Sequence, residues 1–224
     1  MKKVNTIMFD FDGTIMDTNE IILNSWDHTF NTLLGHDADR ELMLEHFGEP
    51  LELSMKKFFG AEGEQVKEYI DIYRSYQTDN FVNDIKLFPG VPEMLQALKE
   101  AGYTLALVTS RLKHTTMQGV EKFGLDRYFD IVITADDCTK HKPDPQPINI
   151  TLEKLGKTAD EAVMVGDTVM DLGCAKNAGV ISVLVGWSMA LPPEKAAGED
   201  APDYILEKSD DMLPILERIN ESAV

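Results

Sequence analysis

The sequence predicts an α/β fold, a doubly wound and mostly parallel sheet with an inserted helical cap subdomain. Two observations predict it. From about residue 86 onward, short apolar runs rich in β-branched residues alternate with amphipathic helical segments. These runs are continuously apolar, which is typical of parallel strands covered by helices on both faces. By contrast, residues 17–82 contain helical patterns and no convincing strand.

The predicted core elements follow one another in a regular order. The pattern indicates strands at 6–11, 104–109, 130–134, 162–166 and 180–185, with helices at 91–102, 114–125, 147–157 and 171–179. The first of these helices illustrates the reasoning. Val91, Met94, Leu95 and Leu98 lie on one stripe of the helix, and Gly102 is typical of its end.

The block from residue 17 to 82 carries the helical cap. Helices are expected at 21–34, 38–48, 49–60 and 62–81, the first of them capped by Asp17 or Thr18. This block has 5 basic and 14 acidic residues, and its net charge of −9 is half of the −18 carried by the whole chain. We therefore expect two parts: an α/β core formed by 1–16 and 83–224, and a helical cap formed by 17–82.

Composition excludes several classes of protein. Lysine and arginine number 21 against 39 acids, and this excess of negative charge argues against binding nucleic acid or anionic membranes. No run of about 18 apolar residues is present, so no transmembrane helix is expected. The amino-terminal stretch lacks the features of a signal peptide. Cys138 and Cys174 are too few for a disulfide framework, which favours a reducing, cytoplasmic location.

Polar side chains follow several of the predicted strands. Because ligands bind at the carboxyl ends of parallel strands, we expect these side chains to converge at one edge of the sheet. The first strand is followed by Asp10 and Asp12, the second by Thr109 and Ser110, and the fourth by Asp167 and Asp171, while Lys142 lies in a loop after the third.

These residue types suit metal-assisted phosphoryl transfer. Carboxylates and carbonyls form the hard-oxygen site that Mg²⁺ prefers, and Mg²⁺ favours a phosphate partner. An aspartate such as Asp10 is a nucleophile in chemistry that passes through an aspartyl-phosphate, and Asp12 is placed to exchange protons with the leaving group and with water. Gly13 permits a tight turn, and Thr109 and Lys142 offer donors to the phosphoryl oxygens.

At these positions the sequence resembles the haloacid dehalogenase superfamily, in its phosphatase branch. DFDGT (10–14), which includes Gly13 and Thr14, matches the first motif, Thr109 the second, Lys142 the third, and GDTVMD (166–171) the fourth. The resemblance implies that Asp10 is the nucleophile and Asp12 the acid/base. It also implies that Mg²⁺ is held by Asp10, the Asp12 carbonyl and Asp167, with Asp171 in support.

The substrate class follows from the same resemblance. The stretches HKPDPQPI, MVGDT and LVGWS are especially similar to the phosphoglycolate phosphatases and the HPr-linked inorganic pyrophosphatases. This implies a small phosphorylated metabolite or pyrophosphate as partner. The oligomeric state is expected to be a monomer or a homodimer. HFGEPL (46–51) resembles the cap loop of those enzymes, but its Glu49 replaces a residue that is often neutral there, which leaves substrate choice open.

Two alternatives to hydrolysis remain open. A sugar-phosphate mutase of the β-phosphoglucomutase type would use the same Asp-x-Asp pair and cap, and a non-catalytic binding protein would keep the fold alone. A true dehalogenase is disfavoured, because its chemistry has no leaving alkoxide to be protonated by Asp12. DFDGT is not a calcium loop, since the third acid before the glycine and the later glutamate are missing.

Overall fold

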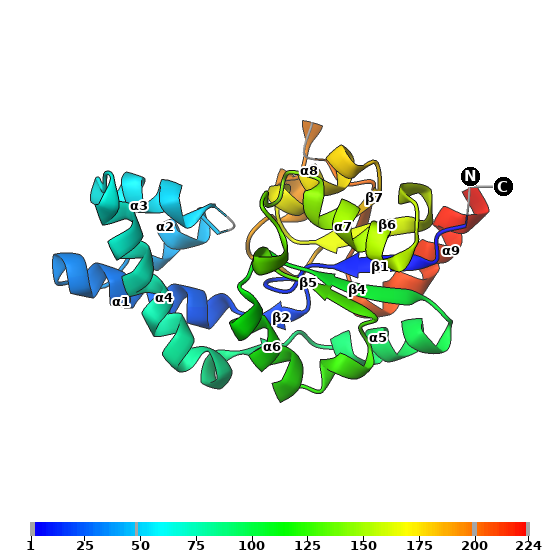
Figure 1. Ribbon diagram of the computed structural model, residues 1–224, viewed down its shortest axis with the longest axis horizontal. Helices are drawn as coiled ribbons and strands as arrows, with labels where there is room; N and C mark the ends of the chain where they lie inside the picture. The colour runs from blue at the N-terminus through cyan, green and yellow to red at the C-terminus, as the bar shows by residue number, and fades with distance from the viewer. Residues whose placement is uncertain (1–2, 48, 199–200, 223–224) are drawn as a thin grey trace. The chain divides into compact units, whose positions relative to one another are not determined.

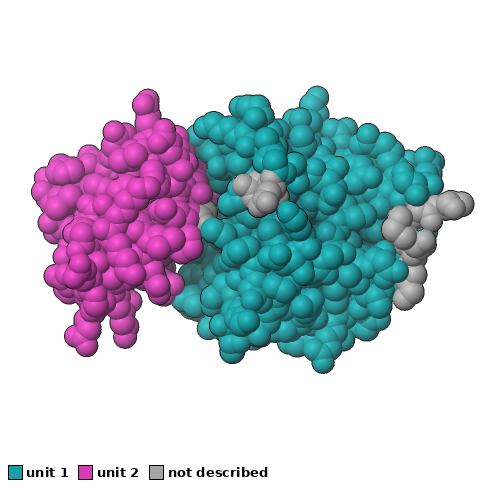
Figure 2. All heavy atoms as spheres, turned by 90° about the horizontal axis from the view of Figure 1, so that it is seen from above, with its two compact units in different colours: residues 1–17, 87–224 teal, residues 18–86 magenta. Residues whose placement is uncertain are grey.

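The computed structural model describes residues 3–47, 49–198 and 201–222. The chain divides into two compact units (Figure 2), unit 1 formed by Met1–Asp17 and Leu87–Val224, and unit 2 formed by Thr18–Lys86. The divisions fall after residues 17 and 86. The sequence predicts them after residues 16 and 82. The later second division arises because the last helix of unit 2 continues to Asp84.

Unit 1 is built on a parallel sheet, which confirms the predicted fold class. Within the described residues the sheet has six strands in the order β5-β4-β1-β6-β7-β8, and every recorded pairing is parallel. The first strand is therefore central, between β4 and β6. The strands are β1 (Thr6–Phe9), β4 (Thr104–Val108), β5 (Ile131–Ile133), β6 (Ala162–Gly166), β7 (Ile181–Val185) and β8 (Tyr204–Leu206).

Helices cover both faces of this sheet, as Figure 1 shows, with α7 and α8 on one side and α5 and α6 on the other. Met8, Val108 and Met164 point to one face and pack with Ile148 and Cys174 in a continuous apolar cluster. The four inner strands β1, β4, β6 and β7 are buried on both faces, which explains their unbroken apolar runs. The helices are α5 (Val91–Glu100), α6 (Lys113–Lys122), α7 (Gln146–Leu155), α8 (Val169–Ala178) and α9 (Met212–Ser222).

The carboxyl-terminal β8 and α9 are not among the predicted elements. The strand is only three residues long and follows a polar, acidic stretch, so its apolar signal is weak. The helix does carry a readable signal, because Met212, Ile215, Leu216 and Ile219 recur at helical spacing and are all buried.

Shorter elements lie at the division between the units and within unit 1. A separate two-stranded sheet pairs β2 (Met16–Asp17) with β3 (Lys86–Leu87), at the points where the chain leaves and re-enters the unit. Single turns of 3₁₀ helix lie between the larger elements, at Leu125–Arg127, Ala135–Asp137, Ala159–Glu161, Pro193–Lys195 and Ser209–Asp211.

Unit 2 is helical and encloses an aromatic core. Trp26 packs against Phe30, Phe58 and Tyr73, with ring centroids 4.8–6.4 Å away. In the described part of the chain, no helix is both long and apolar enough to cross a membrane. The helices are α1 (Asn19–Leu34), α2 (Arg40–Leu44), α3 (Leu51–Phe59) and α4 (Glu64–Asp84).

Two details of unit 2 differ from the expected pattern. The second helix ends at Leu44 with Glu45 as its cap, well before the expected end at Gly48, which lies outside the described residues. Thr18 occupies the amino-terminal cap position of α1, but its side chain makes no capping hydrogen bond. Helix α3 ends as expected, at a left-handed Gly60.

Candidate active site

The central position of β1 brings three strand ends together. Asp10 continues β1, and its backbone N–H donates to the Val165 carbonyl of β6 over 2.8 Å. Thr109 continues β4 in the same way, and its backbone N–H donates to Ile133 over 3.0 Å. Asp167 follows β6 directly. The structure thus places these three residues at the carboxyl edge of the sheet, where open α/β sheets bind ligands.

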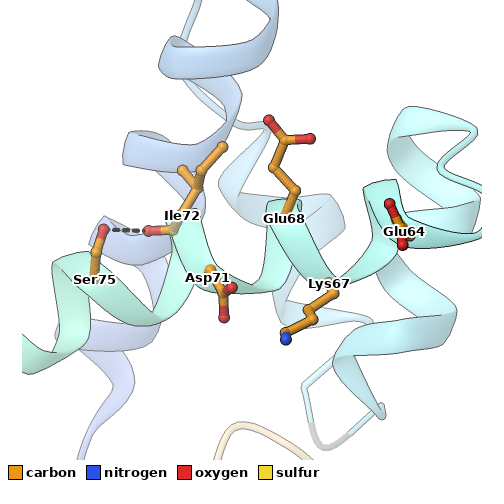
Figure 3. A pocket seen from close by; sticks show the side chains of 6 residues that line it. All are labelled: Glu64, Lys67, Glu68, Asp71, Ile72 and Ser75. Atoms are coloured by element: carbon orange, nitrogen blue, oxygen red, sulfur yellow. Dashed lines mark hydrogen bonds between the residues drawn. The ribbon is translucent and has the colours of Figure 1, made fainter.

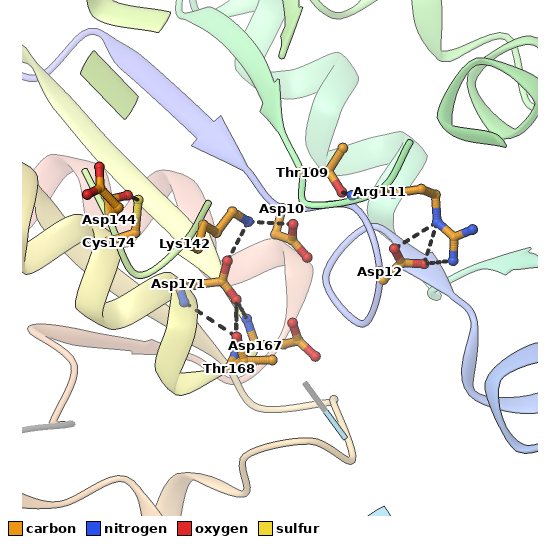
Figure 4. A network of polar contacts seen from close by, with 10 residues as sticks. All are labelled: Asp10, Asp12, Thr109, Arg111, Lys142, Asp144, Asp167, Thr168, Asp171 and Cys174. Atoms are coloured by element: carbon orange, nitrogen blue, oxygen red, sulfur yellow. Dashed lines mark hydrogen bonds and ion pairs between the residues drawn. The ribbon is translucent and has the colours of Figure 1, made fainter. Parts of the chain in front are cut away.

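Lys142 bridges two carboxylates at this edge (Figure 4). Its Nζ donates to Asp10 Oδ1 and to Asp171 Oδ1, each over 2.6 Å, and its side chain is only 3% exposed. It lies in the loop between β5 and α7, before a cis peptide bond to Pro143. Burial alone would lower the pKa of Lys142, but the carboxylates of Asp10 and Asp171 raise it above its usual range.

Asp171 is held by the start of α8. Its Oδ2 accepts from the Thr168 backbone N–H over 3.1 Å and from the Thr168 hydroxyl over 2.7 Å, and Thr168 is the helix cap. This reciprocal capping box fixes the side chain, so that its other oxygen meets Lys142. The acid in the first helical turn therefore has a local structural role as well as its place in the network.

Asp167 has one oxygen occupied and one oxygen unmatched. Ser188, which follows β7, donates its hydroxyl to Asp167 Oδ2 over 2.6 Å. Asp167 Oδ1 is buried and has no hydrogen-bond partner among the described residues. Gly13 closes over this carboxylate, since it has a φ of 73° and a Cβ there would lie 1.9 Å from Asp167 Oδ2. An unmatched buried oxygen requires a partner, such as a cation or water.

The carboxylates of Asp10, Asp167 and Asp171 fit a divalent metal ion. Each offers one oxygen, and these three atoms all lie within 4.8 Å of one another. Burial raises the pKa of Asp10 to about 7, with the charges of Asp171 and Asp12 adding to the shift and Lys142 opposing it. Burial and the charges of Asp171 and Asp10 also raise the pKa of Asp167. A hard cation such as Mg²⁺ would relieve this repulsion and suit the all-oxygen donor set.

The Asp12 side chain pairs with Arg111. The guanidinium donates to both Asp12 oxygens, from Nε over 2.8 and 3.2 Å and from Nη2 over 2.8 Å. The Arg111 backbone N–H in turn donates to the buried Thr109 hydroxyl over 3.1 Å. Figure 4 shows both contacts at the end of β4. The atom expected to bind metal at Asp12 is its backbone carbonyl, and both oxygens of its side chain accept hydrogen bonds from Arg111.

Several predicted residues lie at the periphery, and some contributors are absent from the sequence prediction. Ser110 is exposed, unlike Thr109. Thr14 accepts a hydrogen bond from Trp187 Nε1 at its carbonyl over 3.1 Å, while its buried hydroxyl has no partner in the described part of the protein. Ser188 was not predicted, and neither was the pairing of Arg111 with Asp12. Arg111 and Ser188 both follow strand ends, the same signal that identified Asp10, but this signal does not indicate which side chains pair.

A surface pocket lies in unit 2. It has a volume of about 640 Å³, lies along α4 in unit 2, and is lined by Glu64, Lys67, Glu68, Asp71, Ile72 and Ser75 (Figure 3). Exposed carboxylates dominate it, and the arrangement is that of a solvated helix face. Also in unit 2, Glu49 accepts a hydrogen bond from Ser54 Oγ over 2.7 Å at the start of α3, which gives this residue a local structural contact.

Comparison with known proteins places this site in a family context. The model of the haloacid dehalogenase-like hydrolase family matches residues 7–185. A protein of Bacillus velezensis named pyrophosphatase PpaX is 38% identical over 214 residues, covering 96% of this chain and 97% of the relative.

Two solved structures share the fold over nearly the whole chain. One, described as a predicted phosphatase from Clostridium acetobutylicum, has a TM-score of 0.85 at 27% identity and covers 96% of this chain and 100% of the other. Another, described as a predicted phosphoglycolate phosphatase from Haemophilus somnus, has a TM-score of 0.81 at 25% identity, with coverage of 96% and 99%.

Proposed function

This chain is an enzyme of the haloacid dehalogenase-like hydrolase family, and from that premise we propose that it is a Mg²⁺-dependent phosphohydrolase acting through an aspartyl-phosphate. Its proposed substrates are small phosphate monoesters or pyrophosphate. The substrate range is supported by the names of its relatives, which include a pyrophosphatase and a phosphoglycolate phosphatase. With two free cysteines, it is proposed to work in the reducing cytoplasm.

One observation carries the proposal above all others. Lys142 is buried between Asp10 and Asp171, and the third carboxylate, Asp167, lies beside them with an unmatched oxygen. Burying four ionisable groups together costs free energy that a structural role rarely repays. Such clusters are typical of catalytic sites, where shifted pKa values match a group to its task.

In the first proposed step, Asp10 attacks phosphorus and the leaving group departs on the opposite side. Lys142 holds the Asp10 carboxylate in place and offers its ammonium to the oxygens of the transferring phosphoryl group. Thr109 supplies a hydroxyl at the neighbouring strand end. Asp12 protonates the leaving oxygen when that oxygen needs a proton.

In the second step, Asp12 removes a proton from a water molecule, which attacks the phosphorus of the aspartyl-phosphate. The bond between phosphorus and the Asp10 oxygen breaks, so that orthophosphate leaves and the Asp10 carboxylate is restored. Asp10, Asp167 and the Asp12 carbonyl are proposed to hold Mg²⁺, with Asp171 orienting Lys142 nearby. When bound, Mg²⁺ supplies positive charge that offsets the negative charge of the phosphoryl group and the carboxylates.

The proposal is tested by replacing the nucleophile. Asp10→Asn should reduce turnover of p-nitrophenyl phosphate in Mg²⁺ to below a few per cent, because the amide cannot form the acyl phosphate. Asp126→Asn, a change of the same type at an exposed position, should leave turnover unchanged. Retention of more than a few per cent of activity by the Asp10 variant would contradict the assignment. Release of stoichiometric orthophosphate without a bisphosphate primer separates a hydrolase from a mutase.

A further inference from the structure

The site contains a second positive charge in addition to Lys142. The Arg111 side chain is only 8% exposed, whereas its partner Asp12 is 27% exposed. Each cation is paired with a different member of the Asp-x-Asp pair, Lys142 with Asp10 and Arg111 with Asp12. The proposed mechanism uses Lys142 at the transferring phosphoryl group. It assigns no task to Arg111.

The distance from Arg111 to the leaving group follows from its contact with Asp12 and from the role proposed for Asp12. In an in-line displacement the leaving oxygen lies opposite the attacking Asp10 oxygen. An acid/base at Asp12 must come within about 2.6–3.2 Å of that leaving oxygen. The Arg111 nitrogens lie 2.8–3.2 Å from the Asp12 oxygens. The guanidinium is therefore within about 6 Å of the leaving oxygen, on the leaving-group side.

We propose that Arg111 binds a negative charge carried by the leaving group itself, so that the site prefers phosphate compounds with an anion on that side. This inference rests on the proposed function and narrows its substrate class. Arg111 would then be a specificity-determining residue.

The chemistry of a guanidinium supports this assignment. It has five N–H donors arranged to bind planar or tetrahedral anions in pairs, and its hydrogen bonds to Asp12 come from Nε and Nη2. Two kinds of leaving group offer the anion at the right place. The leaving half of pyrophosphate is a phosphate. The leaving half of phosphoglycolate carries a carboxylate that is separated from the bridging oxygen by one methylene. An alkyl phosphate with a neutral alcohol presents no charge to Arg111.

A purely structural role makes a different prediction. If Arg111 only positions Asp12, its loss should slow all substrates that need Asp12 by a similar factor. If Arg111 binds the leaving group, replacing it should lower kcat/KM selectively for substrates whose leaving group is charged. The ratio of kcat/KM values between charged and neutral leaving groups separates these roles, because an effect on Asp12 common to both substrates cancels.

The experiment uses Arg111→Gln, Arg111→Lys and the control Lys113→Gln, all in the full chain with Mg²⁺. Lys113 is exposed and lies two residues from Arg111, so Lys113→Gln removes one positive charge from the same segment, as Arg111→Gln does. The substrates are pyrophosphate, 2-phosphoglycolate and 2-hydroxyethyl phosphate, the last being the neutral counterpart of phosphoglycolate. Arg111→Gln should lower kcat/KM about 30- to 1000-fold more for a charged leaving group than for the neutral one. Whichever charged substrate shows this selective loss identifies the source of the anion.

Arg111→Lys keeps the charge but loses the forked geometry, so its selective loss should be smaller than that of Arg111→Gln. Equal losses on charged and neutral substrates in both variants would overturn the inference and leave the proposed function standing. Calorimetric binding of methylenediphosphonate and methylphosphonate provides a readout without turnover. The wild type should prefer the diphosphonate and Arg111→Gln should lose that preference. An unchanged preference would overturn the inference, whereas absent turnover of all substrates by the wild type would instead overturn the proposed function.

Discussion

Each unit of the protein contains a cation that bridges two carboxylates, and the two bridges differ in burial. In unit 1, Lys142 joins Asp10 and Asp171, and all three side chains are at most 10% exposed. In unit 2, Arg40 joins Asp27 and Glu20, with side chains 45%, 20% and 65% exposed. The same charge pattern thus occurs once in a desolvated environment and once in contact with water.

The difference teaches where this protein accepts the cost of burying charge. Among the described residues, every charged residue that is buried lies in unit 1, and these residues are Asp10, Lys142, Asp167 and Asp171. The buried residues of unit 2 are apolar, aromatic or hydroxyl-bearing. Exposed ion pairs contribute little to stability, whereas a buried charge that loses its partner is strongly unfavourable. The buried cluster therefore reports on function, and the exposed pair is a surface feature.

The largest expected effect breaks the buried bridge. Lys142→Met leaves Asp10 and Asp171 without their cation and should lower the free energy of unfolding of the metal-free protein by about 3–5 kcal/mol. It should also reduce turnover at least about 100-fold, because the phosphoryl oxygens lose an ammonium. Chemical denaturation and steady-state kinetics measure the two effects.

Arg40→Met is the matched control in unit 2, since it also removes a cation from two carboxylates. Its free energy of unfolding should fall by less than about 1 kcal/mol, because this pair is exposed. Similar stability losses in the two variants would show that burial does not distinguish the two bridges.

Mg²⁺ should stabilise the protein, and more so at higher pH. In the metal-free fold the pKa of Asp10 is about 7 against an ordinary value of 3.8, so the folded state holds a proton that the unfolded state has released. The stability contributed by this group is therefore present at low pH and is lost as the pH rises from about 4 to about 7. Metal binding requires the ionised carboxylates and offsets this loss.

The measurement is thermal or chemical unfolding with and without Mg²⁺ at pH 5 and pH 8. At a Mg²⁺ concentration 100-fold above the dissociation constant, the gain should be about 2.7 kcal/mol, and it should be larger at pH 8 than at pH 5 at the same concentration. Asp167→Asn removes a proposed ligand and should abolish most of the gain. A gain in that variant equal to the wild type would place the ion elsewhere.

A smaller effect compares two glycines with the same backbone conformation. Gly13 and Gly35 have φ values of 73° and 78°, so alanine is strained at both. In the described chain, a Cβ on Gly35 meets nothing within 4 Å, whereas one on Gly13 meets Asp167 Oδ2 at 1.9 Å. Gly13→Ala should therefore cost about 1–2 kcal/mol more than Gly35→Ala in denaturant unfolding, because it adds overpacking to strain. Equal costs would indicate that Asp167 moves away freely, and Mg²⁺ binding by Gly13→Ala would then be unimpaired.

Much of the fold was predictable because its signals are local. The strand at 162–166 is found with the predicted bounds, and the other predicted strands are found within a few residues of theirs. Continuous apolar runs require burial on both faces wherever they occur in such a sheet. The three-residue β8 has no comparable signal, and it is ordered by pairing with β7 and by the Asp203 carboxylate, which accepts from Ser182 N–H over 2.8 Å.

The candidate site divides in the same way. Strand-end positions indicated Asp10, Thr109 and Asp167, because the edge of a parallel sheet collects them. The partners of these residues depend on distances between remote segments. The pairing of Arg111 with Asp12 joins residues 99 positions apart in the chain, and no spacing rule predicts which side chain will meet which.

Local patterns in the sequence are enough to predict the α/β class, the helical unit within it and the acidic strand ends, since hydrophobic periodicity and turn chemistry act over a few residues. Tertiary structure alone decided that Lys142 bridges Asp10 and Asp171, that Ser188 binds Asp167, and that Arg111 holds Asp12. The physical reason is that the energy of a charge depends on its burial and on its nearest partner. Both are properties of the folded chain.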